Sequence, residues 1–345
     1  MVSNVSQKEQ VMRSLQKTGL GPESTFVTDL PMPTAGAGEV IMRVEACGLC
    51  GSDLHAWRTD PGYEWVKPPV VLGHEVVGTI IEVALGVHGW NIGDRAVVVS
   101  IQGCLDCVDC HAGNTQRCQT RRVIGLSYDG GMSEYVRVSA SYLVPVDANM
   151  KAEVAAAVEP LSVAAHVTLT VGGVVSGQQV VVSGAGFVGI GCALIARQAG
   201  ADVILVGAPR DAVSRLPAAA ALGIKTRTVD EQNWGNPDIW IEASGAPSAL
   251  EMAFADTRTG GRIAVVGMFS QPATANMNFL VRHELEVRGS YASVESDYRL
   301  VIDMISSGRL EVDSLLEKFA LEDATLALEA AAESRTLKPI LIPGN

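Results

Sequence analysis

The chain has 345 residues, a formal net charge of −12, 48% hydrophobic residues and 35 glycines. This length exceeds the usual size of one domain, so we expect two domains of a globular α/β protein. The acidic balance argues against a nucleic-acid partner, which requires a basic face. Residues 1–20 lack the apolar stretch of a secretion signal, and the most apolar long stretch, residues 161–176, is too short to span a bilayer. The sequence therefore predicts a cytoplasmic protein with no membrane partner.

The chain has two successive regions that differ in their expected secondary structure. Residues 24–150 contain short apolar stretches separated by Gly and Pro, which predict an all-β, barrel-like unit. From residue 178 onward, strand-like stretches alternate with helical ones at 187–199 and 211–222, which predicts a parallel sheet covered by helices. A helix at 296–308, another at 321–333 and a short strand at 337–342 complete the expected elements.

Four cysteines within the β-rich region have the spacing C-x2-C-x2-C-x7-C: Cys104, Cys107, Cys110 and Cys118. In a reducing compartment, clustered cysteines bind metal more often than they form disulfides. Four thiolates close a tetrahedral Zn²⁺ shell and leave no position for a substrate, so we predict a structural zinc lobe over about residues 100–120. The alternatives are an iron–sulfur cluster, inert buried cysteines, or a small zinc module that binds a partner.

A glycine-rich turn lies between an expected strand and an expected helix. Gly184, Gly186 and Gly189 form the pattern G-x-G-x-x-G. Gly184 permits the tight turn, Gly186 lets a pyrophosphate approach the backbone, and Gly189 lets the helix pack on the strand. This predicts a dinucleotide-binding Rossmann domain; an ordinary glycine-rich α/β turn is the alternative. Further expected cofactor contacts are Phe187, Val188, Gly207, Gly267 and Met268.

The residues after the next strand bear on the choice of cofactor. The strand ends at Gly207, where an NAD site usually has an Asp or Glu that binds the ribose hydroxyls. Without that carboxylate a 2'-phosphate is not repelled, and Arg210 or Arg215 can supply a charge-assisted contact. Asp211 can instead turn back to serve NAD, and Arg210 can be a solvated surface residue. We favour NADP over NAD.

Three further segments carry metal-ligating groups: residues 47–55 (CGLCGSDLH), GHE with His74 and Glu75, and VEPLSVAAH with Glu159 and His166. One thiolate, one imidazole and one carboxylate leave a fourth position for substrate, as catalytic zinc requires. A lone His or Cys in an apolar stretch is usually part of the core, and a Glu before Pro often caps a helix. Their occurrence together with a dinucleotide turn favours a catalytic metal site.

These motifs resemble those of the zinc-dependent medium-chain dehydrogenase/reductase family, which includes zinc alcohol, sorbitol and threonine dehydrogenases. CGLCGSD, GHE, the four-cysteine run, EP and GAGFVG occur in the family's order, and the resemblance covers nearly the whole chain after about residue 20. It implies a GroES-like β-barrel catalytic domain formed by residues 1–158 and 296–345, and a Rossmann domain with a doubly wound parallel sheet at 159–295. It also implies one catalytic and one structural zinc per chain and a homotetramer, with a dimer as the alternative.

The resemblance also implies which residues ligate the catalytic zinc. In the family the zinc cysteine is followed by x-S/T-D, which here identifies Cys50, so that Cys47 and Cys192 become small buried residues. His74 corresponds to the imidazole ligand. The two carboxylates, Glu75 and Glu159, correspond to groups that ligate zinc directly, through water or in exchange, and the sequence does not choose between them.

Three residues near Cys50 correspond to supporting groups of the family. Ser52 resembles the proton-relay hydroxyl, and His55 resembles the outer end of that relay. Asp53 resembles the group that fixes the tautomer of His74. The implied reaction transfers hydride between a nicotinamide cofactor and a small-molecule secondary alcohol, diol or polyol, or the corresponding ketone or aldehyde.

The sequence departs from its relatives where substrate specificity is decided. Sorbitol-type members carry an Arg–aromatic pair after the last Rossmann strand, whereas this chain has Ala292 and Ser293, which disfavours sorbitol itself. Trp57, Tyr63 and Tyr128 either line the substrate pocket or simply pack. An L-threonine-type dehydrogenase is an alternative, although the sequence offers no convincing carboxylate-binding arginine.

Two further hypotheses fit the sequence less well. A zinc-free quinone or enoyl reductase of the same superfamily lacks the metal cysteine, the imidazole ligand and the four-cysteine lobe, all of which this chain has. A catalytically silent metal and nucleotide sensor keeps the fold but is expected to lose a ligand or the relay serine, and no such loss is visible.

Overall fold

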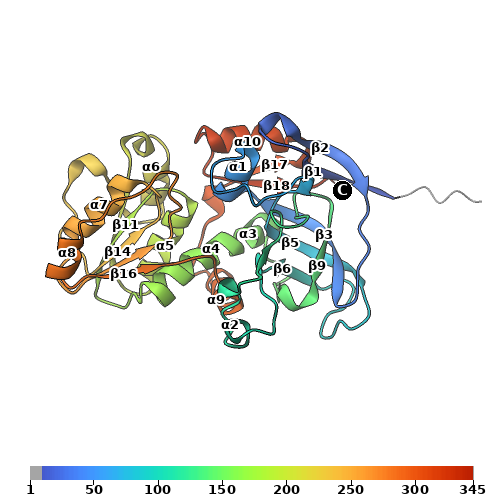
Figure 1. The fold of residues 1–345 in the computed structure, drawn as a ribbon, viewed down its shortest axis with the longest axis horizontal. Helices are drawn as coiled ribbons and strands as arrows, with labels where there is room; N and C mark the ends of the chain where they lie inside the picture. The colour runs from blue at the N-terminus through green and yellow to red at the C-terminus, as the bar shows by residue number, and fades with distance from the viewer. Residues whose placement is uncertain (1–9, 345) are drawn as a thin grey trace, which may run out of the picture. The chain divides into compact units, whose positions relative to one another are not determined.

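The computed structural model describes residues 10–344 and divides into two compact units (Figure 1). The barrel unit comprises residues 10–102, 122–156 and 317–344, and the parallel-sheet unit comprises residues 103–121 and 157–316. The predicted domain boundaries, at 158/159 and 295/296, place residues 103–121 and 296–316 with the barrel instead. The contacts of these two segments group them with the parallel sheet.

The barrel unit is built on a seven-stranded sheet with the order β10-β6-β5-β3-β18-β17, in which β9 also pairs with β3. The strands are β3 (Glu39–Gly48), β5 (Glu75–Val83), β6 (Arg95–Val98), β9 (Tyr135–Ser139), β10 (Leu143–Pro145), β17 (Leu316–Ala320) and β18 (Lys338–Ile342). A three-stranded sheet, β2-β1-β4, and a small ribbon, β7-β8, complete the unit. They consist of β1 (Val11–Lys17), β2 (Thr25–Pro31), β4 (Val70–Val71), β7 (Ile101–Gln102) and β8 (Arg122–Val123). The GroES-like fold class is confirmed, and the first strand begins earlier than the expected residue 24.

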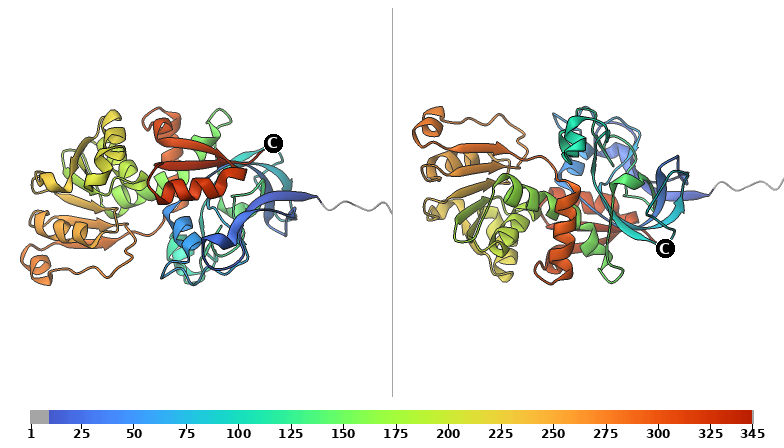
Figure 2. Two further views of the ribbon diagram at one scale, coloured as in Figure 1. Left: turned by 90° about the horizontal axis from the view of Figure 1, so that it is seen from above. Right: turned by 90° about the horizontal axis from the view of Figure 1, so that it is seen from below.

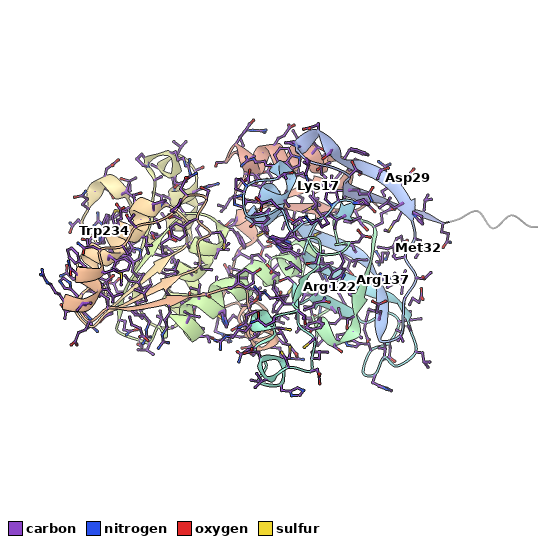
Figure 3. The ribbon with its side chains drawn as sticks, in the orientation of Figure 1. Lys17, Asp29, Met32, Arg122, Arg137 and Trp234 are labelled. Carbon is purple, nitrogen blue, oxygen red and sulfur yellow. The ribbon has the colours of Figure 1, made fainter. Side chains whose placement is uncertain are left out.

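Three helices belong to the barrel unit: α1 (Gly51–Arg58), α3 (Ala152–Ala156) and α10 (Ala324–Ala332). The end of α1 is fixed by Lys17, which is labelled in Figure 3. Its fully buried side chain donates to the Trp57 carbonyl (3.3 Å) and to Thr59 Oγ1 (3.1 Å). A cation at a helix C-terminus satisfies carbonyl groups that have no partner within the helix. This contact anchors the helix that carries Ser52, Asp53 and His55.

The second unit contains a six-stranded, wholly parallel sheet with the order β13-β12-β11-β14-β15-β16. Its strands are β11 (Gln179–Ser183), β12 (Asp202–Gly207), β13 (Lys225–Thr228), β14 (Ile239–Glu242), β15 (Arg262–Val265) and β16 (Glu286–Gly289). Helices α5 (Phe187–Gln198), α6 (Arg215–Ala221) and α7 (Pro247–Asp256) pack on the sheet, and α8 (Met277–Arg282) packs on α7 (Figure 2). The strand order, with β12 and β14 on either side of β11, is that of a doubly wound sheet, as predicted.

The remaining helices of this unit are α2 (Val108–His111), α4 (Val158–Ala165) and α9 (Glu295–Ser306). The helix expected at 211–222 is shorter than predicted. A 3₁₀ turn at Pro209–Ala212 precedes α6, because the Asp211 carboxylate accepts from the Ala208 N–H (2.9 Å) and closes a separate turn. A side-chain acceptor at this position competes with continuation of the helix.

The longest apolar helical stretch runs over Ala152–Val171 and ends in a π-helical segment, His166–Val171. Its 20 residues are long and apolar enough to cross a membrane by length and composition, so the expectation that no stretch is long enough was wrong. However, 78% of its most apolar window is buried within the protein. A helix that is apolar on all sides and buried among side chains is a core helix.

Candidate metal centre and cofactor groove

Two elements of the barrel unit bring together one thiol, one imidazole and one carboxylate. β3 and β5 pair so that Gly48 faces Glu75, with His74 one residue earlier, and Cys50 directly precedes α1. The ligand atoms of Cys50, His74 and Glu75 all lie within 4.8 Å of one another. A sulfur, a ring nitrogen and a carboxylate oxygen at this separation form a donor set that suits Zn²⁺.

Asp53 contacts two of the three residues of this cluster. One of its oxygens accepts from the Cys50 N–H (2.9 Å), and the other lies 3.4 Å from His74 Nδ1. Burial alone lowers the pKa of His74, but Asp53 and Cys50 raise it, with a net value well above the ordinary one. With Nδ1 facing a carboxylate, Nε2 is the nitrogen available to a metal, and it lies 3.3 Å from Ser52 Oγ.

Glu75 is held by a buried cation that the sequence analysis missed. Lys338, at the start of β18, forms an ion pair with both carboxylate oxygens of Glu75 and donates to the Leu49 carbonyl (2.9 Å). The lysine is 3% exposed and the glutamate 0%. A Cβ at Gly48 would lie 1.9 Å from Glu75 Oε2, so only glycine leaves room for this carboxylate. A lysine in the otherwise apolar stretch LKPILI was the available signal.

His55 lies near the exposed end of α1 and has its own carboxylate. Its Nδ1 is 2.7 Å from Asp60 Oδ2, its ring stacks on Tyr63 with centroids 5.0 Å apart, and both partners of the ion pair are about one third exposed. Tyr63 in turn stacks on Trp65. The ring is therefore within reach of solvent, and Asp60 fixes its orientation.

The four cysteines predicted to hold a structural metal form a compact cluster within the parallel-sheet unit. All four are free, and their sulfur atoms lie within 4.8 Å of one another. Backbone N–H groups point at the sulfurs: that of Cys104 at Cys118 Sγ (3.4 Å) and that of Cys107 at Cys104 Sγ (3.3 Å). Hydrogen bonds, first from Thr120, lower the pKa of Cys118 to about 6, so this thiol ionises readily. Among residues 10–344, the group of metal-ligating side chains here consists of these four sulfurs, which fits a closed zinc site.

The glycine-rich turn adopts the geometry that the sequence predicts. Gly184 has a φ of +109°, and a Cβ there would lie 2.7 Å from the Ser244 nitrogen. A Cβ at Gly189 would lie 1.8 Å from the Gly184 oxygen, so this glycine allows α5 to pack on the turn. At Gly186 a Cβ would meet nothing within 4 Å, which leaves the start of α5 open to an anion.

A groove of about 280 Å³ runs over this turn and the end of β12. Of the predicted cofactor contacts, it is lined by Gly184, Gly186, Gly207, Arg210 and Arg215. The other predicted contacts do not line it: Phe187, Val188, Gly189, Gly267 and Met268. Gly267 instead packs against Glu242 and Gly245, since a Cβ there would lie 2.4 Å from each. Met268 is 63% exposed.

The end of β12 carries a glycine where a typical NAD site has a carboxylate, and the space around this glycine is narrow. A Cβ at Gly207 would lie 3.0 Å from Leu216 Cδ2 and 3.1 Å from Asp211 Cβ. Asp211 is itself buried. One of its carboxylate oxygens accepts from the Ala208 N–H, and the other lies 3.5 Å from Arg215 Nη1. Arg215 Nε is buried without a hydrogen-bond partner, and Arg210 is exposed at the groove.

Glu159 lies on α4 in the parallel-sheet unit and is 6% exposed. Two buried contacts fix this helix. Ser162 Oγ donates to the Glu159 carbonyl (2.6 Å) and lies 2.7 Å from Ser293 Oγ, and His166 Nδ1 lies 2.8 Å from Asp297 Oδ2. His166 is therefore engaged with a carboxylate of α9 and acts as a packing residue.

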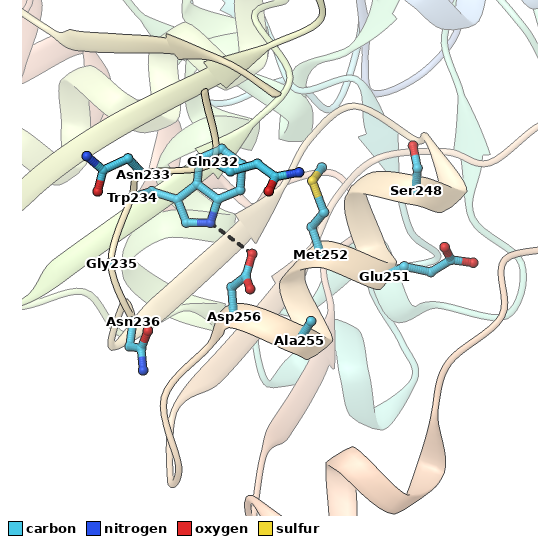
Figure 4. A pocket seen from close by; sticks show the side chains of 10 residues that line it. All are labelled: Gln232, Asn233, Trp234, Gly235, Asn236, Ser248, Glu251, Met252, Ala255 and Asp256. Atoms are coloured by element: carbon cyan, nitrogen blue, oxygen red, sulfur yellow. Dashed lines mark hydrogen bonds between the residues drawn. The ribbon is translucent and has the colours of Figure 1, made fainter. Parts of the chain in front are cut away.

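A larger groove of about 650 Å³ lies between residues 232–236 and α7 (Figure 4). Trp234 Nε1 donates to Asp256 there (2.9 Å). Its lining includes none of the predicted site residues, and it shares only Ser248 and Met252 with the cofactor groove. The volume of a groove therefore does not identify the catalytic site in this molecule.

Comparisons with known proteins identify the family of this chain. Residues 36–148 match the model of the alcohol dehydrogenase GroES-like domain, and residues 188–307 match that of the zinc-binding dehydrogenases. Sorbitol dehydrogenase of Halalkalibacterium halodurans is 30% identical over 346 residues, which cover 96% of this chain and 99% of that protein. The chain belongs to the zinc-dependent medium-chain dehydrogenase/reductase family. It is a zinc-dependent oxidoreductase of alcohols or polyols.

Among the solved structures of similar dehydrogenases, one contains NADP and another contains NADH. A zinc-binding dehydrogenase candidate from Sinorhizobium meliloti, bound to NADP, has a TM-score of 0.88 and 26% identity, and covers 97% of this chain and 100% of its own. A short chain alcohol dehydrogenase of Escherichia coli CFT073, complexed with NADH, has the same TM-score and identity, with coverage of 96% and 99%. The choice between NADP and NAD in this dehydrogenase therefore depends on the residues of its own cofactor groove.

Three aromatic residues of this dehydrogenase are candidates for the substrate pocket. Trp57 is 7% exposed, and its buried Nε1 has no hydrogen-bond partner among residues 10–344. Tyr63 lies between His55 and Trp65. The hydroxyl of Tyr128 is likewise buried and unpartnered, while its ring packs under the guanidinium of Arg122, which lies 4.4 Å from the centroid. Burial raises the pKa of Tyr128 far above its ordinary value, so this residue stays neutral.

Proposed function

We propose that this protein is an NADP-preferring alcohol or polyol dehydrogenase. A secondary alcohol loses a hydride to C4 of the nicotinamide and a proton to solvent, and gives a ketone and the reduced cofactor. The observation that carries this proposal is the donor set of Cys50, His74 and Glu75, whose ligand atoms lie within 4.8 Å in a chain that also forms a dinucleotide turn.

Cys50 and His74 would hold the catalytic zinc, and carboxylates complete the set. Zinc bound there supplies a Lewis acid that lowers the pKa of an alcohol hydroxyl. Glu75 lies with Cys50 and His74 in the fold and is also paired with Lys338, and the family resemblance offers Glu159 as the alternative carboxylate. Cys104, Cys107, Cys110 and Cys118 would hold the structural zinc.

The proton leaves through side chains of α1. Ser52 Oγ, 3.3 Å from His74 Nε2, receives the hydroxyl proton, because it can donate and accept at once. His55 lies one helical turn further along α1 and carries the proton to solvent. Its contact with Asp60 holds the ring in place for the transfer.

The preference for NADP rests on the end of β12. Gly207 supplies no carboxylate, and Asp211 contacts the Ala208 N–H and Arg215. Asp211 also lines the groove, but its contacts with the Ala208 N–H and Arg215 compete with binding of a ribose diol. Arg210 is exposed at the groove and Arg215 also lines it, so both offer guanidinium groups to a 2'-phosphate.

Separate fluorescence titrations with NADPH and NADH test this preference. We expect NADPH to bind at least tenfold more tightly, and Arg210→Ala to reduce that margin about tenfold, because a charge-assisted contact is lost. Arg282→Ala, which removes an exposed arginine of α8, is the matched control and should change neither affinity. Equal or tighter binding of NADH would refute the preference and leave the dehydrogenase assignment in place.

We also propose a cytoplasmic homotetramer, with a dimer as the alternative. Its catalytic domain comprises residues 1–158 and 296–345, and its cofactor domain comprises residues 159–295. Equilibrium sedimentation of the zinc-loaded protein measures the assembly. A monomer at micromolar concentration would contradict it.

A further inference from the structure

The loop that lines the larger groove, residues 232–236, is anchored to its surroundings. Just before it, the Glu231 carboxylate accepts from the Thr228 N–H (3.0 Å) and closes a 3₁₀ turn. Within it, Trp234 is buried in the hydrophobic core beside the sheet, and its Nε1 donates to Asp256 of α7. The indole therefore ties this loop both to the core and to α7.

Gln232 lies in this loop and carries a free carboxamide. It is exposed, and within residues 10–344 its side chain forms no hydrogen bond. Its φ of +43° lies in the left-handed region, which is strained for a residue with a side chain. In Figure 4 its carboxamide extends toward Met252, whereas that of Asn233 points away from α7. The anchored loop thus offers one amide donor and one amide acceptor on the side of α7.

The larger groove adjoins the cofactor groove along α7. Ser248 and Met252, one helical turn apart, line both grooves, and all the lining residues belong to the parallel-sheet unit. The cofactor groove encloses about 280 Å³, which is less than the roughly 300–1,000 Å³ of typical cofactor sites. The larger groove adds about 650 Å³. A dinucleotide that starts at the glycine-rich turn therefore has room to extend past Met252.

The chemistry of the cofactor groove changes along its length. The glycine-rich turn offers backbone N–H groups to a diphosphate, and Arg210 offers a cation to a ribose phosphate. Toward α7 the lining becomes apolar, with Val229, Ala249 and Met252. Apolar side chains suit the faces of a planar ring, whose polar edge then needs hydrogen-bonding groups at the rim. The base of a dinucleotide is such a ring.

We propose that Gln232 binds the amino edge of the adenine base of the cofactor, with Ser248 as a second contact. The inference rests on the proposed dehydrogenase function and adds a specificity-determining residue to its cofactor site. The adenine amino group donates hydrogen bonds, and the ring nitrogens on either side of it accept them. A carboxamide has an acceptor and a donor side by side, so it pairs with both groups at once. The larger groove is thus the outer part of the adenine site.

The charges of the larger groove favour a base edge over a phosphate. Among residues 10–344, its lining includes two acids, Glu251 and Asp256, and no lysine or arginine. The Glu251 carboxylate accepts from Thr274 Oγ1 (2.9 Å). A phosphate placed here would meet two negative charges without a cation, which is unfavourable. The amino group of adenine is neutral and only donates, so the acidic lining does not oppose it.

The probes are NADP and its etheno analogue, in which a two-carbon bridge joins the amino nitrogen of adenine to the adjacent ring nitrogen. The bridge removes the amino hydrogens and leaves the diphosphate, the riboses and the nicotinamide unchanged. In calorimetric titrations of the zinc-loaded protein, we expect the wild type to bind NADP about 3- to 10-fold more tightly than the analogue. Gln232→Ala should weaken NADP binding by about the same factor and leave the analogue unchanged within twofold, because only hydrogen bonds to the amino edge are lost. Ser248→Ala should weaken NADP binding about 2- to 3-fold.

Two further variants separate the carboxamide from the backbone. Asn233→Ala is the matched control, since it removes a carboxamide from the same loop but one that points away from α7; it should change neither affinity. Gln232→Gly removes the carboxamide at a position whose left-handed backbone suits glycine, and it should give the same loss as Gln232→Ala. Equal binding of the two probes by the wild type, equal losses in the Gln232 and Asn233 variants, or a loss confined to Gln232→Ala would overturn the proposal.

Turnover and a smaller probe separate this inference from the proposed function. Adenine is common to NADP and NAD, so the same comparison with NAD and its etheno analogue serves if NAD is preferred. If the protein oxidises alcohols but Gln232→Ala binds both probes as the wild type does, the inference fails and the dehydrogenase function stands. If no alcohol is oxidised with either cofactor, the proposed function fails. Titration of AMP, which carries the base without nicotinamide, into the wild type and Gln232→Ala then still decides whether this residue binds adenine, and equal or absent binding by the two would overturn it.

Discussion

The four cysteines of the lobe come from fifteen consecutive positions, whereas Cys50, His74 and Glu75 depend on the pairing of β3 with β5. The lobe cluster is partly exposed, and backbone N–H groups of its own loop support the sulfurs. The barrel cluster is mostly buried, and distant residues balance its charges: Asp53 for the imidazole and Lys338 for the carboxylate. The four-cysteine cluster is supported by groups of its own loop, whereas the buried cluster of mixed charge requires charged partners that the folded sheet brings to it.

The largest expected effect comes from breaking the local cluster. Cys118→Ser removes one of four thiolates, and we expect it to abolish tight zinc binding there, where a complete site contributes on the order of 10 kcal/mol. Zinc content measured after gel filtration should fall by one ion per chain, and the barrel cluster should keep its metal. Cys192→Ala, a buried cysteine outside both clusters, is the control. Unchanged zinc content would show that the lobe is not a metal site.

Breaking the charge balance of the barrel cluster comes next. Lys338→Met leaves the Glu75 carboxylate buried without its cation, and we expect the free energy of unfolding to fall by about 3–5 kcal/mol. Chemical denaturation measures the loss, and Lys318→Met, which removes an exposed lysine paired with Glu153, should cost less than about 1 kcal/mol. Adding Glu75→Gln to Lys338→Met should recover most of the stability. No recovery would mean that the lysine acts through packing alone.

The tautomer of His74 provides a finer test of the same cluster. Asp53→Asn removes the charge facing Nδ1, and zinc affinity should fall about 10- to 100-fold, as is typical for groups that orient a ligand. Competition with a chromophoric chelator measures this affinity. Asp60→Asn is the matched control, because it also removes a carboxylate from a histidine but one outside the ligand set. A similar loss in both variants would rule out a specific role for Asp53.

The smallest effect concerns a buried glutamate without a cation. Glu242 is fully buried, and its oxygens accept from the N–H groups of Ser244 and Gly245. Burial raises the pKa of Glu242, although these hydrogen bonds oppose the shift. The folded protein therefore holds this proton more tightly than the unfolded chain, and stability falls as pH rises from the ordinary glutamate pKa through the raised one.

Glu242→Gln should remove this slope. Thermal midpoints of the wild type and the variant, compared between pH 4.5 and 7, should converge at the acid end and diverge in favour of the variant as pH rises. Glu311→Gln, at an exposed position, should show no such difference. Parallel curves for the wild type and Glu242→Gln would contradict the raised pKa and remove the contrast between Glu242 and the cation-paired Glu75.

Much of the fold was predictable because its signals are local. The spacing of Gly184, Gly186 and Gly189 requires only a strand, a turn and a helix in succession, and the four cysteines require only a short loop. The β-to-α change of texture near residue 178 likewise predicts the two sheet types. The order of the family's motifs along the chain indicates Cys50, His74 and Glu75 as ligands, and their ligand atoms lie together in the fold.

The sequence by itself determined the local motifs, the family and the general chemistry of the site. Tertiary structure alone decided which partners those residues meet: Lys338 for Glu75 across 263 positions, the Ala208 N–H and Arg215 for Asp211, and Tyr291 for Arg121. The physical reason is that charge pairing and stacking depend on distance in space. A sequence fixes the order in which groups occur, but only the packed sheets determine which charges are neutralised and which stay free for a ligand.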